Sequence, residues 1–332
     1  MISILRILAA PRLTLLGMAL LGVAVVTIYV KPVVPSWWLL AVLALLAINL
    51  ASALLSHARL RRGGLLVFHL ALLGLILLVG VGRLVRFDGH VEITEGSAFS
   101  AADVEALHRG PLHPFRLQRV HFVQGPFSVD YVAGLSRSHT RSHVLVRDAK
   151  GQGVWTEIGD DKPLLQAGYR FYTTSNKGFA PLITWTPKGG RPSSGTLNMP
   201  SYPLMEWNQQ SHWTPPGGTE IAFDLHLKTN FSTTADWVLD GKSKQTILTL
   251  ITTNGRFNLK PGETADLSQG SLRFDELRTW MGYSIFYDPT LPWLFIVAMT
   301  GVGGLAWHYW RSSERQQPVV GAVPSLSRSV ML

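Results

Sequence analysis

Residues 65–82 read LLVFHLALLGLILLVGVG, a run without a single Asp, Glu, Lys or Arg. A helix needs roughly 20 apolar residues to cross a hydrocarbon core of about 30 Å. One charged side chain at mid-bilayer costs a few kcal/mol, so an uncharged run of this length is typical of a membrane span. Three further runs of the same kind lie at residues 13–30, 37–56 and 291–310. The sequence therefore predicts a membrane protein with four transmembrane α-helices, three before a large polar region and one after it.

The polar region, residues 83–290, is long enough to form a core of its own. Short segments rich in β-branched and aromatic residues alternate there with Gly, Pro, Asn and Asp, which is typical of antiparallel strands. We expect an all-β domain with sandwich or barrel-like packing, a short helix around residues 100–108 capped by Ser100, and an irregular segment over residues 187–218. The predicted strands cover residues 91–94, 116–123, 128–132, 144–147, 154–158, 169–174, 182–185, 220–227, 246–252 and 272–274.

The distribution of charge predicts the orientation in the membrane. The net charge of +9 does not indicate nucleic-acid binding, because residues 86–288 hold 20 basic and 20 acidic residues and are neutral. The excess lies in the flanks, where basic residues mark cytoplasmic segments. Residues 1–12, the loop 57–64 and the tail 311–332 are therefore predicted to be cytoplasmic, and the β domain extracytoplasmic. The basic residues on the predicted cytoplasmic side are Arg6, Arg12, Arg59, Arg61, Arg62, Arg311, Arg315 and Arg328.

The chain has no cysteine. This excludes a structural disulfide, a thiol–disulfide relay, a Cys nucleophile and covalent attachment of haem to this chain. Phosphate-binding, dinucleotide-binding, serine-hydrolase and zinc-protease motifs are also absent from the sequence.

His69 is the candidate site residue, because it lies five residues into the third apolar run. A buried imidazole needs a partner for its ring nitrogens. The residues alone leave two interpretations. Neutral histidine is a common haem ligand. Alternatively, His69 forms a hydrogen bond to a neighbouring helix, for which Asn49 is the candidate. Gly74, Gly80 and Gly82 on the same run permit close approach of another helix or of a flat macrocycle.

Eight further histidines lie in the predicted β domain. His139 and His143 are four apart, a metal-ligand spacing on a helix, but they lead directly into a strand-like segment with basic neighbours. Most of the eight are expected to be solvated surface groups. Tyr202, Trp207 and Trp213 are candidates for binding a client or partner. The favoured role for these aromatic side chains is to fill the core of the β domain.

The layout resembles the ResB (CcsB) family of cytochrome c biogenesis proteins. The resemblance rests on Phe68-His69 and the glycines that follow it in the third run, on Glu95-Gly96 after the first strand, and on Gly168-Tyr-Arg-Phe-Tyr-Thr-Thr-Ser175. It also rests on Tyr287-Asp-Pro289-x-x-Pro292 at the entrance to the last run. The resemblance covers essentially the whole chain.

The resemblance implies a role in a system II haem-attachment complex in the bacterial inner membrane. Members of the family work with a CcsA-type haem-handling membrane protein to carry haem b outward and attach it to apocytochrome c. His69 matches the family's third-span histidine, which implies that it is an axial ligand of the haem iron. The partners implied are the CcsA-type protein, apocytochrome c and the lipid bilayer, with no nucleic acid.

The chain departs from a complete synthase in lacking the Trp-rich haem-handling segment. The resemblance therefore implies a non-catalytic subunit, with any synthase activity expected from the complex with the partner. The β domain is also compact for the family. Two alternatives stay open. One is a membrane-anchored scaffold or sensor that binds no haem. The other is a b-type haem electron carrier, although such a carrier usually has more than one intramembrane histidine, and the last span offers only His308 at its edge.

Overall fold

The computed structural model describes residues 2–31, 37–147, 150–203, 209–216, 218–228, 231–241, 245–253 and 255–314. It consists of two compact units. The helical unit combines Met1–Val85 with Pro289–Leu332, and the β unit is Arg86–Asp288. Four helices are long and apolar enough to cross a membrane, and the β unit is built from antiparallel sheets. The predicted fold class, a membrane protein with four spans and a large β domain, is confirmed.

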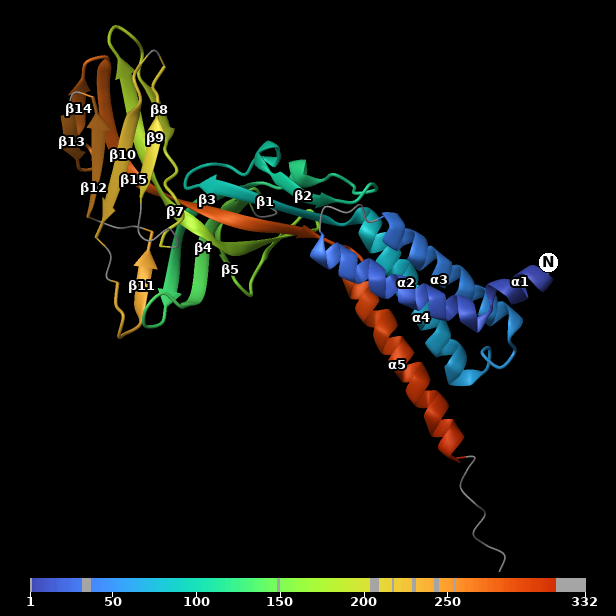
Figure 1. Ribbon diagram of the computed structural model, residues 1–332. Coiled ribbons are helices and arrows are strands. Elements are labelled where there is room, and N and C mark those ends of the chain that lie inside the picture. Colours follow the sequence, from blue (N-terminus) through green and yellow to red (C-terminus); the bar gives the residue numbers. More distant parts are fainter. Residues whose placement is uncertain are drawn as a thin grey trace, which may run out of the picture. The chain divides into compact units, whose positions relative to one another are not determined.

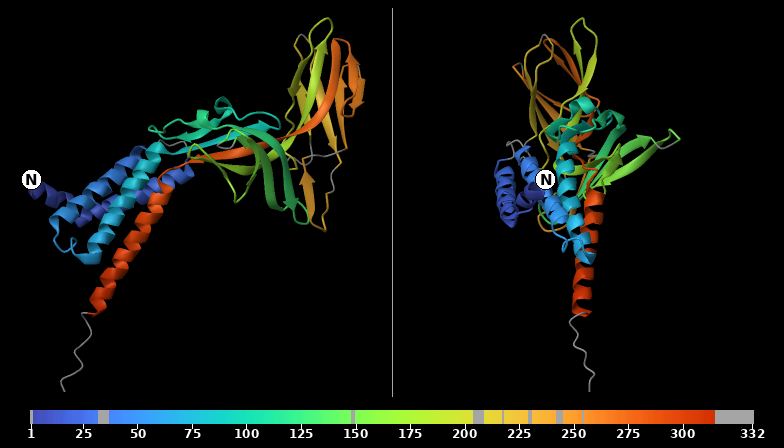
Figure 2. Two further views of the ribbon diagram at one scale, coloured as in Figure 1. Left: turned by 180° about the vertical axis from the view of Figure 1, so that it is seen from behind. Right: turned by 90° about the vertical axis from the view of Figure 1, so that its right-hand side faces the viewer.

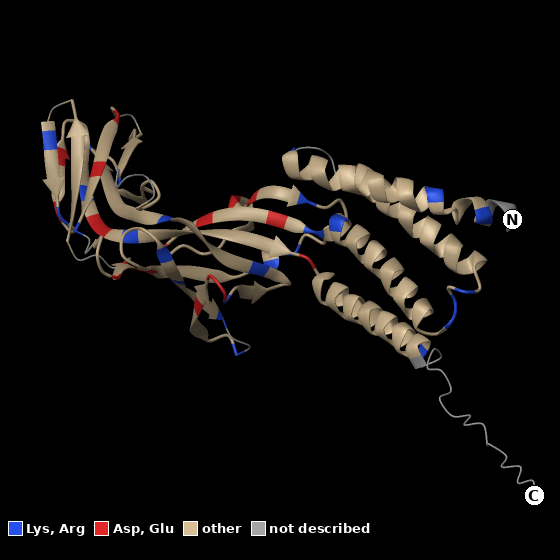
Figure 3. Ribbon diagram, turned by 60° about the horizontal axis from the view of Figure 1, so that its bottom comes forward, with Lys and Arg blue, Asp and Glu red and all other residues tan. Residues whose placement is uncertain are grey.

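The helical unit holds the four spanning helices and a short helix that precedes them (Figure 1). Large apolar side chains remain exposed along these helices, among them Leu15, Phe295 and Met299, as expected for surfaces that face lipid. Figure 3 shows that Lys and Arg lie near the helix ends and in the loop that connects the second and third spanning helices, residues 57–62. The helices are α1 (Ile2–Leu8), α2 (Pro11–Val30), α3 (Trp37–Ser56), α4 (Gly63–Val85) and α5 (Leu291–Glu314).

Helices α4 and α5 pack through small residues. A Cβ atom added to Gly304 would lie 2.8 Å from Val67 Cγ1 and 2.9 Å from Phe68 N. A Cβ atom on Gly301 would lie 3.1 Å from Ala71 Cβ. Small residues at the contact let the two backbones approach closely, which is how helices associate where the surrounding lipid is as apolar as the side chains.

Asn49 connects α3 to the junction between α1 and α2. Its Nδ2 donates to the carbonyl oxygen of Leu8 at 2.6 Å and to that of Ala10 at 3.4 Å. Its Oδ1 accepts from Thr14 Oγ1 at 2.7 Å. The last carbonyls of a helix lack partners within that helix, and the buried Asn49 amide supplies a donor to the one at Leu8, the end of α1. The Ala10 carbonyl also accepts from Leu13 N at 3.0 Å.

The β unit contains a seven-stranded sheet and two four-stranded sheets (Figure 1, Figure 2). The seven-stranded sheet runs β2-β1-β15-β7-β6, with β14 paired to β15 and β8 to β7. The smaller sheets run β13-β12-β10-β9 and β11-β3-β4-β5. The strands are β1 (Phe87–Thr94), β2 (Glu105–Arg109), β3 (Phe122–Tyr131), β4 (Arg137–Arg147), β5 (Gly153–Gly159), β6 (Leu164–Gln166), β7 (Tyr169–Pro187), β8 (Ser193–Thr196), β9 (Gln210–Trp213), β10 (Ile221–Leu227), β11 (Trp237–Asp240), β12 (Thr246–Thr252), β13 (Gly255–Leu259), β14 (Thr264–Leu267) and β15 (Gly270–Tyr287).

Two long strands, β7 and β15, pair with each other and serve two hydrophobic cores. Leu272 and Phe274 on β15 are buried in one core, together with Phe179 of β7. Tyr283 on β15 is buried in the other core, together with Tyr169 of β7. The register of the pair shifts between Phe274 and Glu276 and again between Met281 and Tyr283. Since a shift of one residue turns a strand's buried side chains to its other face, one strand can supply both cores.

Three local predictions are wrong. Residues 116–123 are not one strand, because a 3₁₀ turn at Leu117–Arg119 precedes β3. Ser100 does cap a turn, accepting from Ala102 N at 3.3 Å, but the turn is 3₁₀ and stops at Asp103, after which the chain enters β2. The stretch 187–218 contains β8 and β9 and is not wholly irregular.

Candidate functional site

His69 forms its hydrogen bond within its own helix. Its Nδ1 lies 2.7 Å from the carbonyl oxygen of Leu65, one turn earlier on α4. A carbonyl oxygen only accepts, so Nδ1 carries the proton. In a neutral imidazole this leaves the lone pair on Nε2. A histidine that ligates a metal usually donates its other ring nitrogen in this way, which fixes both the tautomer and the ring orientation.

The alternative partner, Asn49, is engaged elsewhere. Within the described part of the chain, its side-chain hydrogen bonds run to Leu8, Ala10 and Thr14. The alternative interpretation, in which His69 forms a hydrogen bond to Asn49, is therefore contradicted. Among the described residues, Nε2 of His69 has no hydrogen-bond partner, and the ring makes an edge contact with Phe68, with 5.3 Å between ring centroids.

His69 lies on the face of α4 opposite to the one that meets α5. The α5 contacts fall at Gly64, Val67, Ala71 and Gly74, positions that line one side of a 3.6-residue helix. His69 is two residues before Ala71, which is about 200° of helical rotation at about 100° per residue. Its side chain is half-buried. The ring therefore lies outside the α4–α5 contact.

The other histidines of the helical unit do not converge on His69. His308 lies on the α5 face that packs on Gly64, since a Cβ atom on Gly64 would lie 2.6 Å from His308 N. Helix α4 thus separates His308 from the face that carries His69. His57 follows α3 and is exposed, with Nδ1 3.2 Å from the carbonyl oxygen of Ala53. Within the described helical unit, neither His57 nor His308 is placed to share a metal ion with His69.

The histidines of the β unit form no metal cluster within the described residues. His139 and His143 lie on β4, where four residues span about 13 Å at about 3.3 Å per residue, too far for both rings to bind one ion. His113 is buried and its Nε2 lies 2.7 Å from the hydroxyl of Tyr169. His226 is exposed and lies 3.5 Å from Asp224. These are structural or solvated groups.

Two of the three aromatic residues proposed as contacts for a client or partner, Tyr202 and Trp213, pack against the core of the β unit. Tyr202 is buried, and its ring makes an edge contact with Phe179 at 5.3 Å between centroids. Trp213 on β9 packs edge-on against Trp185 at 6.2 Å. Trp207 lies outside the described residues. The core role favoured from the sequence is confirmed for Tyr202 and Trp213.

Sequence reasoning missed a buried polar network in the β unit. The Tyr283 hydroxyl donates to Gln124 Oε1 at 2.6 Å. The Ser142 hydroxyl oxygen lies 2.6 Å from the Tyr283 hydroxyl oxygen. Gln124 Nε2 also donates to Ser142 Oγ at 2.9 Å. Burial raises the pKa of Tyr283 above its ordinary value, outweighing the opposing hydrogen bonds from Ser142 and Gln124. The three residues come from β15, β3 and β4, a convergence that no local pattern shows.

A second missed feature is a fully buried lysine. Lys177 on β7 has 1% of its surface exposed, and its Nζ lies 3.3 Å from the carbonyl oxygen of Ser175 and 5.8 Å from the centre of the Tyr131 ring. Burial, assisted by the charge of Arg137, lowers the pKa of Lys177 to about 8. The charged form is disfavoured because the interior is less polar than water.

Comparison with known proteins agrees with this architecture. A search of curated proteins found no match for the chain. The model of the ResB-like family matches residues 56–316, which includes α4 with His69, the β unit and α5. The chain belongs to the ResB-like family and has a role related to cytochrome c biogenesis.

Proposed function

We propose that this protein is the non-catalytic membrane subunit of a system II haem-attachment complex, in which Nε2 of His69 is one axial ligand of haem b. The observation that carries the proposal is the hydrogen bond from Nδ1 to the Leu65 carbonyl, which leaves Nε2 as the nitrogen able to bind iron. The residues fit the ligand, because imidazole is a common axial ligand and the ring lies on a face that α5 leaves open.

The second axial ligand belongs to a partner in this proposal. His308 packs against the opposite face of α4, and a bis-histidine site needs two imidazoles. A CcsA-type protein with an intramembrane histidine supplies the second one. This arrangement makes haem retention depend on the complex, since neither chain holds both ligands.

Cell-based haem attachment tests the proposal. The chain is co-expressed with a CcsA-type partner and a reporter c-type cytochrome in cells that lack their own assembly system. Covalent haem on the reporter is measured after denaturing electrophoresis. His69→Ala is expected to reduce the signal at least tenfold, and imidazole in the medium to restore part of it. His57→Ala, which removes an exposed imidazole of the same unit, serves as control. Unchanged attachment in His69→Ala contradicts the proposal.

We also propose that both termini are cytoplasmic and that the β unit is extracytoplasmic, from the basic residues that flank the spans. The absence of cysteine makes the test direct, because a single introduced thiol is the only reactive one in the chain. Ser138→Cys on β4 should react with a membrane-impermeant maleimide in intact spheroplasts. Ser313→Cys at the end of α5 should react only after lysis. The reverse pattern overturns the orientation.

The β unit docks apocytochrome c in this proposal by adding a client strand to an open sheet edge. Strand β5 ends the sheet β11-β3-β4-β5, and Val154 on it is 47% exposed. A lysine on an edge strand opposes such pairing. Val154→Lys should weaken co-purification of the apocytochrome, and Val238→Lys on β11, at the other edge, should not. Equal loss in both variants would contradict docking at β5.

A further inference from the structure

One end of the β unit carries both of its connections to the spanning helices. Strand β1 begins at Phe87 and β15 ends at Tyr287, and these two residues pair with each other in the sheet. The nearest helical residues along the chain are Val85, which ends α4, and Leu291, which begins α5. Both helices are long and apolar enough to cross a membrane. This end of the sheet is therefore only a few residues along the chain from the ends of two spans.

The loop that follows β2, residues 110–116, is fixed at this end of the sheet. Gly110 N donates to the carbonyl oxygen of Arg86 at 2.8 Å. His113, in the middle of the loop, is buried, and its ring meets that of Tyr287 edge-on with 5.0 Å between centroids. The loop is therefore held against the first and last residues of the β unit.

Large apolar side chains are exposed on this loop. Leu112 is 64% exposed and Phe115 is 42% exposed. Strand β2 runs antiparallel to β1 and ends opposite Phe87, so the chain returns along β2 toward the start of β1 before it enters the loop. Leu112 is two residues after Gly110, a reach of at most about 7 Å. The headgroup layer on each side of a hydrocarbon core is about 5–8 Å deep, so Leu112 and Phe115 are within reach of the headgroups.

The charged side chains around the loop are basic. Residues 106–119 contain three arginines and no Asp or Glu. Arg109 and Arg116 are exposed, and neither forms an ion pair with any residue that the structure describes. The Arg109 guanidinium lies 4.6 Å from the centre of the Phe115 ring, beside the apolar surface. Asp88 on β1 is already paired, at 2.7 Å, with the arginine two residues before it.

This combination of side chains is complementary to one kind of surface. Arginine presents a planar fork of donors that matches the oxygens of a phosphate. Exposed apolar side chains bordered by basic ones bind at the boundary between the headgroups and the acyl chains, and anionic lipids strengthen the binding. The position of the loop beside two span ends favours the membrane of these spans over a separate protein.

We propose that the loop 110–116 is a membrane-contacting surface of the β unit, which inserts Leu112 and Phe115 into the interface of a membrane that contains anionic phospholipid and binds lipid phosphates through Arg109 and Arg116. This contact holds the connected end of the β unit at a fixed depth. The proposal rests on the spans and on the β unit alone. It requires neither haem nor a particular side of the membrane.

Depth-dependent quenching tests the insertion. Because the chain has no cysteine, Leu112→Cys gives a single thiol for an environment-sensitive fluorophore. The labelled full chain is reconstituted into vesicles of phosphatidylcholine and phosphatidylglycerol in equal amounts. A phosphatidylcholine with a nitroxide on its headgroup should remove most of the fluorescence, and the emission should be shifted to the blue. Leu135→Cys, at a 50% exposed leucine in the turn between β3 and β4, is the matched control and should lose none.

A titration tests the role of the arginines. The labelled full chain in a neutral detergent is titrated with phosphatidylglycerol, and the emission shift of the Leu112→Cys label reports binding. Arg109→Gln with Arg116→Gln should weaken binding about thirtyfold, since one arginine beside an anionic membrane surface contributes about fivefold. Arg191→Gln with Arg256→Gln removes the same charge from exposed positions elsewhere in the β unit and should leave the affinity unchanged.

Three results would overturn the proposal. Quenching of the Leu112→Cys label by aqueous iodide and not by the nitroxide lipid would place the loop in water. A blue-shifted label that neither quencher reaches would show that protein covers the loop. Equal affinity for phosphatidylglycerol in the two double variants would exclude phosphate binding by Arg109 and Arg116. His69→Ala should leave all of these measurements unchanged, so the proposal is separable from the haem site.

Discussion

The Nδ1 atom of His69 lies 2.7 Å from the carbonyl oxygen of Leu65, so the imidazole is hydrogen-bonded within its own helix, and it forms no hydrogen bond to another helix among the residues that the structure describes. This hydrogen bond engages Nδ1, so Nε2 is the ring nitrogen whose lone pair is available to a ligand. It also separates the roles of the two polar side chains that the sequence places in neighbouring spans, because Asn49 serves the α1–α2 junction.

Replacing Asn49 should lower the thermal stability of the chain and leave haem binding unchanged. Asn49→Ala removes the amide that bonds the Leu8 carbonyl and the Thr14 hydroxyl, and an unsatisfied buried group costs about 1–3 kcal/mol. We expect a lower melting temperature of the full chain in detergent and an unchanged haem spectrum of the partner complex. A spectral change as large as that of His69→Ala would mean that the two residues act together.

The close contact of Gly304 on α5 with α4 is predicted to contribute to the thermal stability of the chain. Gly304→Ala places a methyl group 2.8 Å from Val67 Cγ1 and 2.9 Å from Phe68 N, and overpacking of this kind typically costs about 1–3 kcal/mol. Gly303→Ala meets nothing within 4 Å and gains the same helix propensity, so it is the matched control. Thermal unfolding should separate the two variants. Equal melting temperatures would contradict close packing at Gly304.

Lys177 gives the β unit a defined pH dependence. Its pKa is lowered from 10.5 to about 8 by burial, so the unfolded chain binds more protons between these values. The stability of the folded state therefore rises as the pH increases from 8 to 10.5. Lys177→Met removes a cost of up to about 3 kcal/mol at pH 7, calculated from about 1.4 kcal/mol per pKa unit.

The check is the melting temperature of wild type and Lys177→Met from pH 7 to pH 10.5. The variant should be more stable at pH 7, and its advantage should shrink above pH 8. Lys162→Met, at an exposed lysine, should show no such trend. A difference between wild type and Lys177→Met that does not change with pH would refute the buried charge as its source.

Tyr283→Phe should destabilise the β unit. The substitution leaves Gln124 Oε1 without its 2.6 Å donor in a buried site, with an expected cost of about 1–3 kcal/mol. Tyr172→Phe, on β7 and only half-buried, is the control and should cost less than 0.5 kcal/mol. The free energy of unfolding by urea measures both. Two equal values would show that the network adds nothing.

Much of the architecture could be predicted because its signals are local. An uncharged run of about 20 residues identifies a span wherever it occurs, and alternation such as Ile221, Phe223 and Leu225 identifies a half-buried strand. The predicted strands 169–174 and 182–185 are parts of one strand, β7. Their union was missed because the stretch between them pairs irregularly with β15. A shift of register depends on the partner strand, which a sequence window does not contain.

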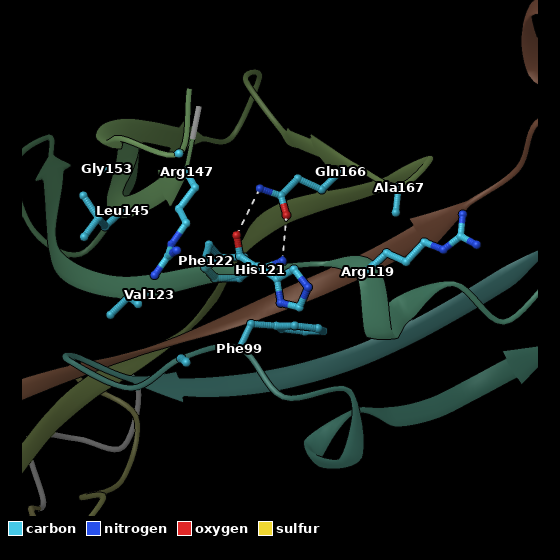
Figure 4. A pocket seen from close by; sticks show the side chains of 12 residues that line it. Phe99, Arg119, His121, Phe122, Val123, Leu145, Arg147, Gly153, Gln166 and Ala167 are labelled. Carbon is cyan, nitrogen blue, oxygen red and sulfur yellow. Dashed lines mark hydrogen bonds between the residues drawn. The ribbon is translucent and has the colours of Figure 1, made fainter. Parts of the chain in front are cut away.

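The candidate site was predictable only in part. His69 could be selected because a histidine among Leu, Val and Phe in a span is unusual. Its hydrogen bond to Leu65 and the engagement of Asn49 depend on rotamers and on the path of α1, which the sequence did not reveal. A cavity of about 980 Å³ in the β unit, with Phe99, Val123, Leu145 and Gln166 among its lining residues (Figure 4), was also missed, because these residues lie far apart in the sequence and become neighbours only in the folded chain.

The most direct test of His69 is the absorbance spectrum of the purified complex with a CcsA-type partner, for wild type and His69→Ala. The account predicts a bis-histidine haem spectrum in the wild type that is lost or shifted in the variant and regained when imidazole is added. A wild-type spectrum retained in His69→Ala would contradict the assignment and reduce His69 to a residue that satisfies its own helix.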